Sequence, residues 1–321
     1  MNDAPPPHLL PFEIDCAAVP GLGAPDPQRF TSWWVEQRDE IDGRLLAHGA
    51  VLFRGTGVST PAAFARLVRA AAPETLDYVD GNSPRTRIAQ GIYTSTEYPA
   101  QYFISLHNEL SYSHRWPARL FFCCVVAAER GGETVVADSR EILRRLDPAL
   151  AEEFRRRGVR YLRNLHGGSG LGPSWQETFE AADRAAVEAF CGDAEMDYEW
   201  RDDGGLRVSQ RRPATIRHPR TGDEVWFNQA DQFHASTHPP EIHAALSRLY
   251  GARPEDLPQH VRWGDGGEMD PADLEAVRAA ARAAMVPVGW REGDVLVVDN
   301  VLVAHGRMPY EGARKILVAM S

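Results

Sequence analysis

Apolar runs of strand length occur in the first half of the chain and again at its end. Residues 120–126 and 133–137 form one pair of runs, and residues 294–299 and 314–320 form another. Runs of this length, rich in β-branched and aromatic side chains, are typical of buried strands. The simplest fold that contains both pairs is a β core with helices inserted between its strands.

The segments between these runs carry helix caps, turns and further strand signals. Asp26-Pro27 opens a helix that continues towards Gly49, and Gly131-Gly132 joins the first two runs in a hairpin pattern. The other expected strands are 50–55, 102–107, strands between 206 and 228, and the continuation of 294–299 to His305. The other expected helices are 60–71, most of 139–191, 239–250 and 271–284. We expect a short flexible lead over residues 1–12 and a single domain over residues 13–321.

His107 and Glu109 stand two residues apart at the end of the expected strand 102–107. Alternate residues of a strand face the same side, so the imidazole and the carboxylate would point to one site. With a distant second histidine they would form a two-histidine, one-carboxylate face, which leaves coordination positions of Fe(II) open for a cosubstrate and oxygen. His305, after the last but one apolar run, is a candidate, but the chain has eleven histidines and the pattern alone does not choose among them.

Composition excludes several other chemistries. A net charge of −10 argues against a nucleic-acid or anionic-membrane surface. No apolar run is long enough to span a membrane and no secretory signal begins the chain, so we expect a soluble, cytoplasmic protein. The four cysteines show no metal-binding or redox spacing, which favours core packing. Lys315 is the only lysine and follows no phosphate-binding loop, and no complete nucleophile elbow or dinucleotide fingerprint is present.

Several motifs in one order resemble the taurine dioxygenase-like family of Fe(II)/2-oxoglutarate oxygenases, in particular its branch related to clavaminate synthase and to natural-product amino-acid hydroxylases. The resemblance covers nearly the whole chain. Its motifs are residues 49–55, 93–112, 131–134, 226–229 and 299–321. It implies a mainly β fold with helical insertions and a double-stranded β-helix, or jelly-roll, core.

The resemblance also implies roles for particular residues. His107, Glu109 and His305 would be the iron ligands. The far carboxylate of 2-oxoglutarate would be held by Arg314 and the Thr134 hydroxyl, and a guanidinium is a fixed fork that suits a carboxylate. The cofactors implied are Fe(II) and 2-oxoglutarate, with O2 as cosubstrate.

Two departures from the family pattern bear on the subgroup and the substrate. The carboxylate ligand is Glu109, where many members have aspartate; glutamate is shared with clavaminate synthase, and a carboxylate there argues against a halogenase. Val318 stands where taurine dioxygenase has a second arginine, which argues against a sulfonate substrate.

The reaction implied is hydroxylation of an unactivated C–H bond in an amino-acid-derived molecule, free, peptidyl or tethered to a carrier protein. Desaturation, epoxidation or cyclisation with the same cofactors stays open as the outcome. Candidate substrate contacts are Ser95, Asn228, Arg307 and Arg85. Two rival classes also stay open, a non-catalytic jelly roll that binds a small molecule or a carrier protein, and a Zn(II) hydrolase or isomerase that uses the same three ligands.

Overall fold

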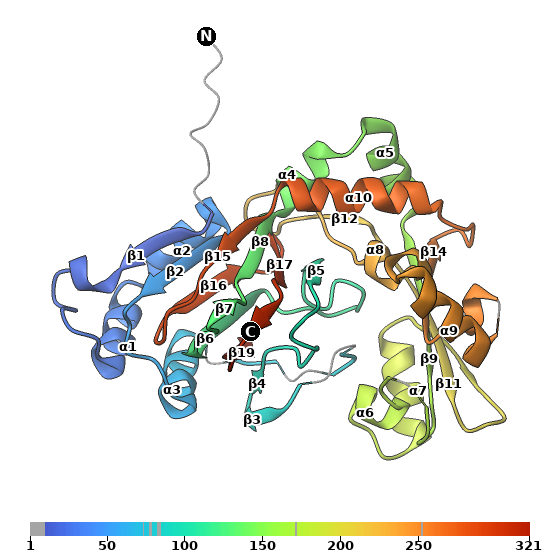
Figure 1. Cartoon of the computed structure of the whole chain (residues 1–321), viewed down its shortest axis with the longest axis horizontal. Coiled ribbons are helices and arrows are strands. Elements are labelled where there is room, and N and C mark those ends of the chain that lie inside the picture. Colours follow the sequence, from blue (N-terminus) through green and yellow to red (C-terminus); the bar gives the residue numbers. More distant parts are fainter. Residues whose placement is uncertain (1–9, 73, 77–78, 82–84, 171, 252) are drawn as a thin grey trace, which may run out of the picture.

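The computed structural model describes residues 10–72, 74–76, 79–81, 85–170, 172–251 and 253–321 (Figure 1). Most of the expected N-terminal lead, residues 1–9, lies outside the described residues, and Phe12 already begins a strand. No helix of the described part is long and apolar enough to cross a membrane.

A seven-stranded sheet forms one half of the core. Its order is β1 (Phe12–Asp15), β2 (Ala50–Arg54), β16 (Val295–Asp299), β6 (Arg119–Val126), β19 (Lys315–Met320), β4 (Ile92–Thr94) and β3 (Arg87–Ala89). Three helices pack on its outer face through a shared apolar cluster: α1 (Pro27–Glu36), α2 (Arg38–His48) and α3 (Pro61–Ala71). Asp26 caps α1 by accepting hydrogen bonds from the Gln28 and Arg29 amides, as its sequence predicts.

A four-stranded sheet covers the inner face of the large one. Its order is β15 (Val286–Val288), β8 (Thr134–Asp138), β17 (Val303–Arg307) and β5 (Ile104–His107). Leu52 and Leu296 of the large sheet share one buried cluster with Val136 and Val303 of the small sheet. The apolar interior therefore lies between two sheets packed face to face, as expected of a mainly β fold.

A helical and β lobe lies beside this core (Figure 1). Its sheet has the order β10 (Asp197–Trp200), β11 (Leu206–Arg212), β9 (Val159–Leu165) and β14 (Gln259–Trp263). The remaining helices are α4 (Ser139–Arg145), α5 (Pro148–Arg157), α6 (Trp175–Phe179), α7 (Arg184–Asp193), α8 (Ala230–Phe233), α9 (Pro240–Tyr250) and α10 (Pro271–Ala283), with three short 3-10 turns at Cys16–Ala18, Ala235–Thr237 and Pro254–Asp256. Two short strand pairs complete the fold, β12 (Thr215–Arg217) with β13 (Glu224–Trp226) and β7 (Arg130–Gly131) with β18 (Tyr310–Glu311).

The expected hairpin through Gly131-Gly132 is wrong. The strands on either side, β6 and β8, belong to different sheets. At Gly131 the backbone has a φ of +66°, and a Cβ atom would lie 2.2 Å from the Pro309 carbonyl oxygen. The glycine pair therefore lets the chain cross tightly from one sheet to the other instead of folding back on itself.

The expected continuous strand from residue 294 to His305 also divides between the two sheets, as β16 and β17. The turn between them is held by Asp299, whose carboxylate accepts the amides of Val301 and Leu302 and contacts His218 Nε2 at 3.1 Å. His305 consequently lies in the middle of β17, although its position in the sequence suggested a strand end.

Two further expectations needed correction, and one was confirmed. The helix predicted from Asp26 to Gly49 breaks at Gln37, whose φ of −100° and ψ of 14° lie outside the helical region; the two halves, α1 and α2, both bury apolar residues against the large sheet. Strand β9 was missed within the stretch predicted as mostly helical. All four cysteines are buried and free, as core packing predicts.

Candidate metal and cosubstrate site

His107 and His305 face each other across the small sheet. They are register partners in the antiparallel pair of β5 and β17, and their ring centroids lie 4.4 Å apart. The Ser105 carbonyl lies 2.8 Å from Nδ1 of His107, which must donate to it, so Nε2 is the nitrogen left to bind a ligand. His305 also contacts the Phe122 ring of the large sheet, so the pair points into the space between the sheets.

Glu109 reaches the same place from beyond the strand. β5 ends at His107, and Glu109 lies in the turn that follows, where Leu110 has a φ of +55°. The backbone of Glu109 is held on both sides by the Asn300 side chain, which accepts its N–H at 2.7 Å and donates to its carbonyl at 3.0 Å. The strand alternation assumed from the sequence is therefore not what orients this carboxylate.

The three side chains form a compact cluster of possible ligand atoms. One nitrogen or oxygen from each lies within 4.8 Å of the other two, and the described residues contain no other group of three or more that meets this criterion. Glu109 Oε2 is 3.7 Å from His305 Nε2. Burial lowers the pKa of His107 and lowers that of His305 well below its usual value, with the neighbouring Arg85 charge adding to both effects. Both imidazoles are therefore neutral at pH 7, the form that binds metals.

A cavity of about 30 Å³ adjoins the two histidines, and most of the predicted cosubstrate and substrate residues line it. Arg314 enters from the start of β19, donates to the Gly132 carbonyl at 2.9 Å, and lies over the Tyr310 ring. Burial and the nearby Arg307 charge lower the pKa of Arg314 to about 10, so it keeps its charge at pH 7. The neighbouring Lys315 is exposed, as expected for the opposite face of the strand.

Thr134 approaches the cavity from the opposite sheet. Its hydroxyl accepts a hydrogen bond from Trp290 Nε1 at 3.0 Å, which leaves its own proton available for a further acceptor. A cation and a hydroxyl donor thus reach one small cavity from two sheets.

The four predicted substrate contacts separate into different environments. Arg85, Ser95 and Arg307 line the cavity. The Arg307 guanidinium donates to the carbonyls of residues 98, 99 and 102 and so also holds that loop. Asn228 is absent from the residues that line the cavity; its amide donates to the Ala214 carbonyl and its oxygen accepts the Ala230 amide, which assigns it to the local structure before α8.

Sequence reasoning missed two residues that orient the site. Asn300 positions the backbone of Glu109, and Trp290 bonds to the Thr134 hydroxyl. Asn300 had a signal, because a buried asparagine directly after an apolar strand must find hydrogen-bond partners. Trp290 had none, since its partner lies 156 residues earlier in the chain.

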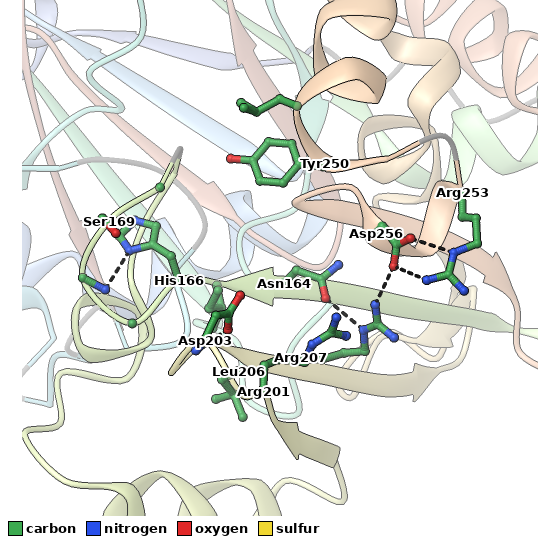
Figure 2. A pocket seen from close by; sticks show the side chains of 16 residues that line it. Asn164, His166, Ser169, Arg201, Asp203, Leu206, Arg207, Tyr250, Arg253 and Asp256 are labelled. Atoms are coloured by element: carbon green, nitrogen blue, oxygen red, sulfur yellow. Dashed lines mark hydrogen bonds and ion pairs between the residues drawn. The ribbon is translucent and has the colours of Figure 1, made fainter.

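A larger cavity, of about 830 Å³, lies in the lobe (Figure 2). It is lined by the loop around His166, by strand residues of β9 and β11, and by the segment after α9. Arg207 and Arg253 both pair with Asp256 there, so one carboxylate offsets part of their charge. His166, Asp203 and Asp256 line this open, polar cavity, but among the described residues they do not form a group of three convergent ligand atoms.

The donor set fits a mononuclear Fe(II) centre. Two imidazoles and one carboxylate, buried and convergent, are the protein ligands of non-haem iron oxygenases, and a two-sheet β core with this face defines that class of protein. Within the described residues, the buried Nδ1 of His305 has no hydrogen-bond partner, so its ring is oriented by packing and by what its Nε2 faces.

Comparison with known proteins identifies the family. Residues 17–320 match the taurine catabolism dioxygenase TauD, TfdA family, and the chain belongs to it. The protein is therefore a non-haem Fe(II)/2-oxoglutarate-dependent dioxygenase that uses Fe(II), 2-oxoglutarate and O2. The expectations of a binding module and of a zinc hydrolase or isomerase are thereby set aside.

Individual relatives agree with this placement. The chain is 41% identical to the dapdiamide synthesis protein DdaC of Enterobacter agglomerans over 280 residues, which are 87% of this chain and 84% of DdaC. It is 30% identical to a clavaminate synthase-like protein of Arabidopsis thaliana over 94% of this chain and 89% of that protein. The crystal structure of PvcB from Pseudomonas aeruginosa has the same fold, with a TM-score of 0.52 and 16% identity over 96% of this chain and 85% of PvcB. The likeness in fold to PvcB, described as an Fe, alpha-ketoglutarate dependent oxygenase, confirms the expected fold class, a mainly β fold with helical insertions.

Proposed function

We propose that the protein hydroxylates an unactivated C–H bond of an amino-acid-derived substrate in natural-product biosynthesis, with Fe(II) held by His107, Glu109 and His305. The observation that carries the metal assignment is the convergence of these three side chains, with Glu109 and His305 buried and His107 half-buried, within 4.8 Å. The pathway assignment is supported by DdaC, which is named for dapdiamide synthesis, and by the description of PvcB as an oxygenase from an isonitrile synthetic pathway.

We assign 2-oxoglutarate to the cavity between the two sheets. Arg314 would hold its far carboxylate through charge-assisted hydrogen bonds, and the Thr134 hydroxyl, oriented by Trp290, would donate to the same group. Phe122 and Ile316 contribute apolar walls, and a less polar surrounding strengthens these charge interactions.

The reaction consumes 2-oxoglutarate, O2 and one C–H bond and yields succinate, CO2 and an alcohol. The bound iron and 2-oxoglutarate supply the activation of O2. The chain's own residues keep the two imidazoles neutral by burial, orient Glu109 through Asn300, and hold the cosubstrate at its far end. Desaturation, epoxidation and cyclisation would use the same residues. These residues do not distinguish a free substrate from a peptidyl or carrier-tethered one.

Anaerobic titration with Fe(II) and then 2-oxoglutarate tests the residue assignments. We expect a weak visible charge-transfer band in the wild type, its loss in His305→Ala, and a higher 2-oxoglutarate requirement in Arg314→Ala. A folded His305→Ala protein with an unchanged band would overturn the ligand assignment. The substrate class is tested by coupled succinate release, which amino-acid-derived compounds should accelerate and taurine should not.

A further inference from the structure

Arg85 forms a buried ion pair with one of the proposed metal ligands. Its Nη2 lies 2.6 Å from Glu109 Oε2, and both side chains are nearly inaccessible, at 3% and 4% exposure. Oε2 is also the oxygen that faces His305 Nε2 at 3.7 Å. The guanidinium is therefore bound to the side of the carboxylate that a metal between Glu109 and His305 would take.

Arg85 also separates two cavities. It lines the metal-site cavity of about 30 Å³ and an adjoining cleft of about 550 Å³, whose other walls include Tyr93 and Glu97 of the core and residues 172–180 of the lobe. The smaller cavity has room for only one or two water molecules. It cannot admit 2-oxoglutarate, which has ten non-hydrogen atoms, unless a side chain of its wall moves.

Three arginines line the metal-site cavity, and Arg85 is the one that bonds to a group a metal would also bind. Arg307 and Arg314 donate to backbone carbonyls, which metal binding leaves in place. Arg85 instead bonds to a carboxylate that the metal also needs, and two cations that share one carboxylate repel each other at short range. Arg85 and Thr86, which precede β3, have no regular secondary structure, so the Arg85 side chain can turn without breaking a sheet.

We propose that the Arg85 guanidinium occupies the place of the metal and neutralises Glu109 in the metal-free protein. When a divalent metal and 2-oxoglutarate bind, the guanidinium moves into the cleft. There it binds a carboxylate group of the substrate. The inference rests on the proposed metal site. The charges at the metal-site cavity support the carboxylate. Fe(II), Arg85, Arg307 and Arg314 together outweigh Glu109 and the 2-oxoglutarate dianion, and a buried net charge needs a counter-ion. Glu97, Glu177 and Glu180 of the cleft are exposed to solvent.

Metal affinity tests the competition. Co(II) titration, followed by its visible absorption, compares the wild type with Arg85→Gln and with Arg87→Gln, which removes an exposed charge from the same cleft. We expect Arg85→Gln to bind Co(II) about tenfold more tightly and Arg87→Gln to stay within about twofold of the wild type. Equal or weaker binding by Arg85→Gln would show that Arg85 supports the loaded carboxylate and would overturn the proposal.

Chemical modification of the wild type tests the displacement without any variant. Phenylglyoxal labels accessible guanidinium groups, and mass spectrometry of peptides reports each arginine separately. We expect Arg85 to be protected in the metal-free protein and to react at least fivefold faster with Co(II) and 2-oxoglutarate bound, with Arg87 as internal reference. Acetate, as a carboxylate probe, should then slow labelling of Arg85 more than that of Arg87.

The outcomes separate this inference from the proposed function. Equal labelling of Arg85 in both states overturns the displacement, and displacement without protection by acetate overturns the carboxylate role, while Co(II) binding in either case leaves the metal site standing. Failure of the wild type to bind Co(II) overturns both.

Discussion

The metal-site cavity and the lobe cavity are both lined by arginines, but the two sets of arginines are bonded differently. In the lobe, Arg207 and Arg253 pair with Asp256 at an open surface. In the core, Arg85 pairs with Glu109, whereas Arg307 and Arg314 donate to backbone carbonyls and have no carboxylate partner among the described residues. We assign the chemistry to the smaller cavity, because charge and ligand atoms that converge in a buried place, rather than volume, are what bind a dianion and a metal.

Of the substitutions that compare the two cavities, we expect the one that removes the Arg314 charge to change 2-oxoglutarate affinity the most. Arg314→Gln removes the cation that would face the far carboxylate, so we expect 2-oxoglutarate affinity to fall roughly 100- to 1000-fold. Anaerobic titration of the charge-transfer band measures it. Lys315→Gln, at the exposed neighbouring position, is the matched control and should bind normally; equal losses in both variants would contradict a specific role for Arg314.

Asn300→Ala tests whether the core site depends on its supports. The change leaves the Glu109 amide and the Pro117 carbonyl without their buried partner, which should lower the free energy of unfolding by about 2–3 kcal/mol. Urea unfolding measures the stability, and Co(II) titration should show weaker binding because Glu109 is no longer held. Unchanged Co(II) affinity in the folded variant would argue that Asn300 serves stability alone.

His234, next to His260, should make the stability of the protein depend on pH. Burial, with the nearby His260 charge, lowers the pKa of His234 from 6.5 to about 4. A histidine whose pKa is lower in the folded state than in the unfolded state lowers the free energy of unfolding as the pH falls, because the unfolded state takes up the proton first. The free energy of unfolding is therefore unaffected by this histidine above pH 6.5 and decreases between pH 6.5 and 4. His234→Asn should therefore reduce the loss of unfolding free energy between pH 7 and 4.5 by about 2 kcal/mol. The same loss in the variant and the wild type would assign the acid sensitivity to other groups.

The smallest effect is expected in the lobe cavity. Arg253→Gln removes one partner of an ion pair in which Arg253 is 70% exposed, and such exposed pairs contribute little to stability. We expect unchanged Co(II) and 2-oxoglutarate binding and an unfolding midpoint in urea that matches the wild type. A marked loss of 2-oxoglutarate binding would show that the two cavities are coupled.

Local sequence patterns anticipated much of the fold. The Asp26 cap and the apolar runs of β2, β6 and β8 depend on neighbouring residues, and the structure has each of them. β9 was missed because Arg160, Arg163 and Asn164 interrupt its apolar pattern; Arg163 is buried there only through its ion pair with Asp80, far away in the chain. A pattern that depends on a distant partner is not visible in a local window.

The sequence by itself determined the residue types of the site: an imidazole and a carboxylate two positions apart, and an arginine before the last strand. The family resemblance named His305, and the tertiary structure places it opposite His107. Only the tertiary structure decided that Asn300, rather than strand alternation, orients Glu109. Caps and apolar runs depend on local interactions, whereas strand pairing and sheet crossing depend on contacts between residues far apart, whose partners no local pattern specifies.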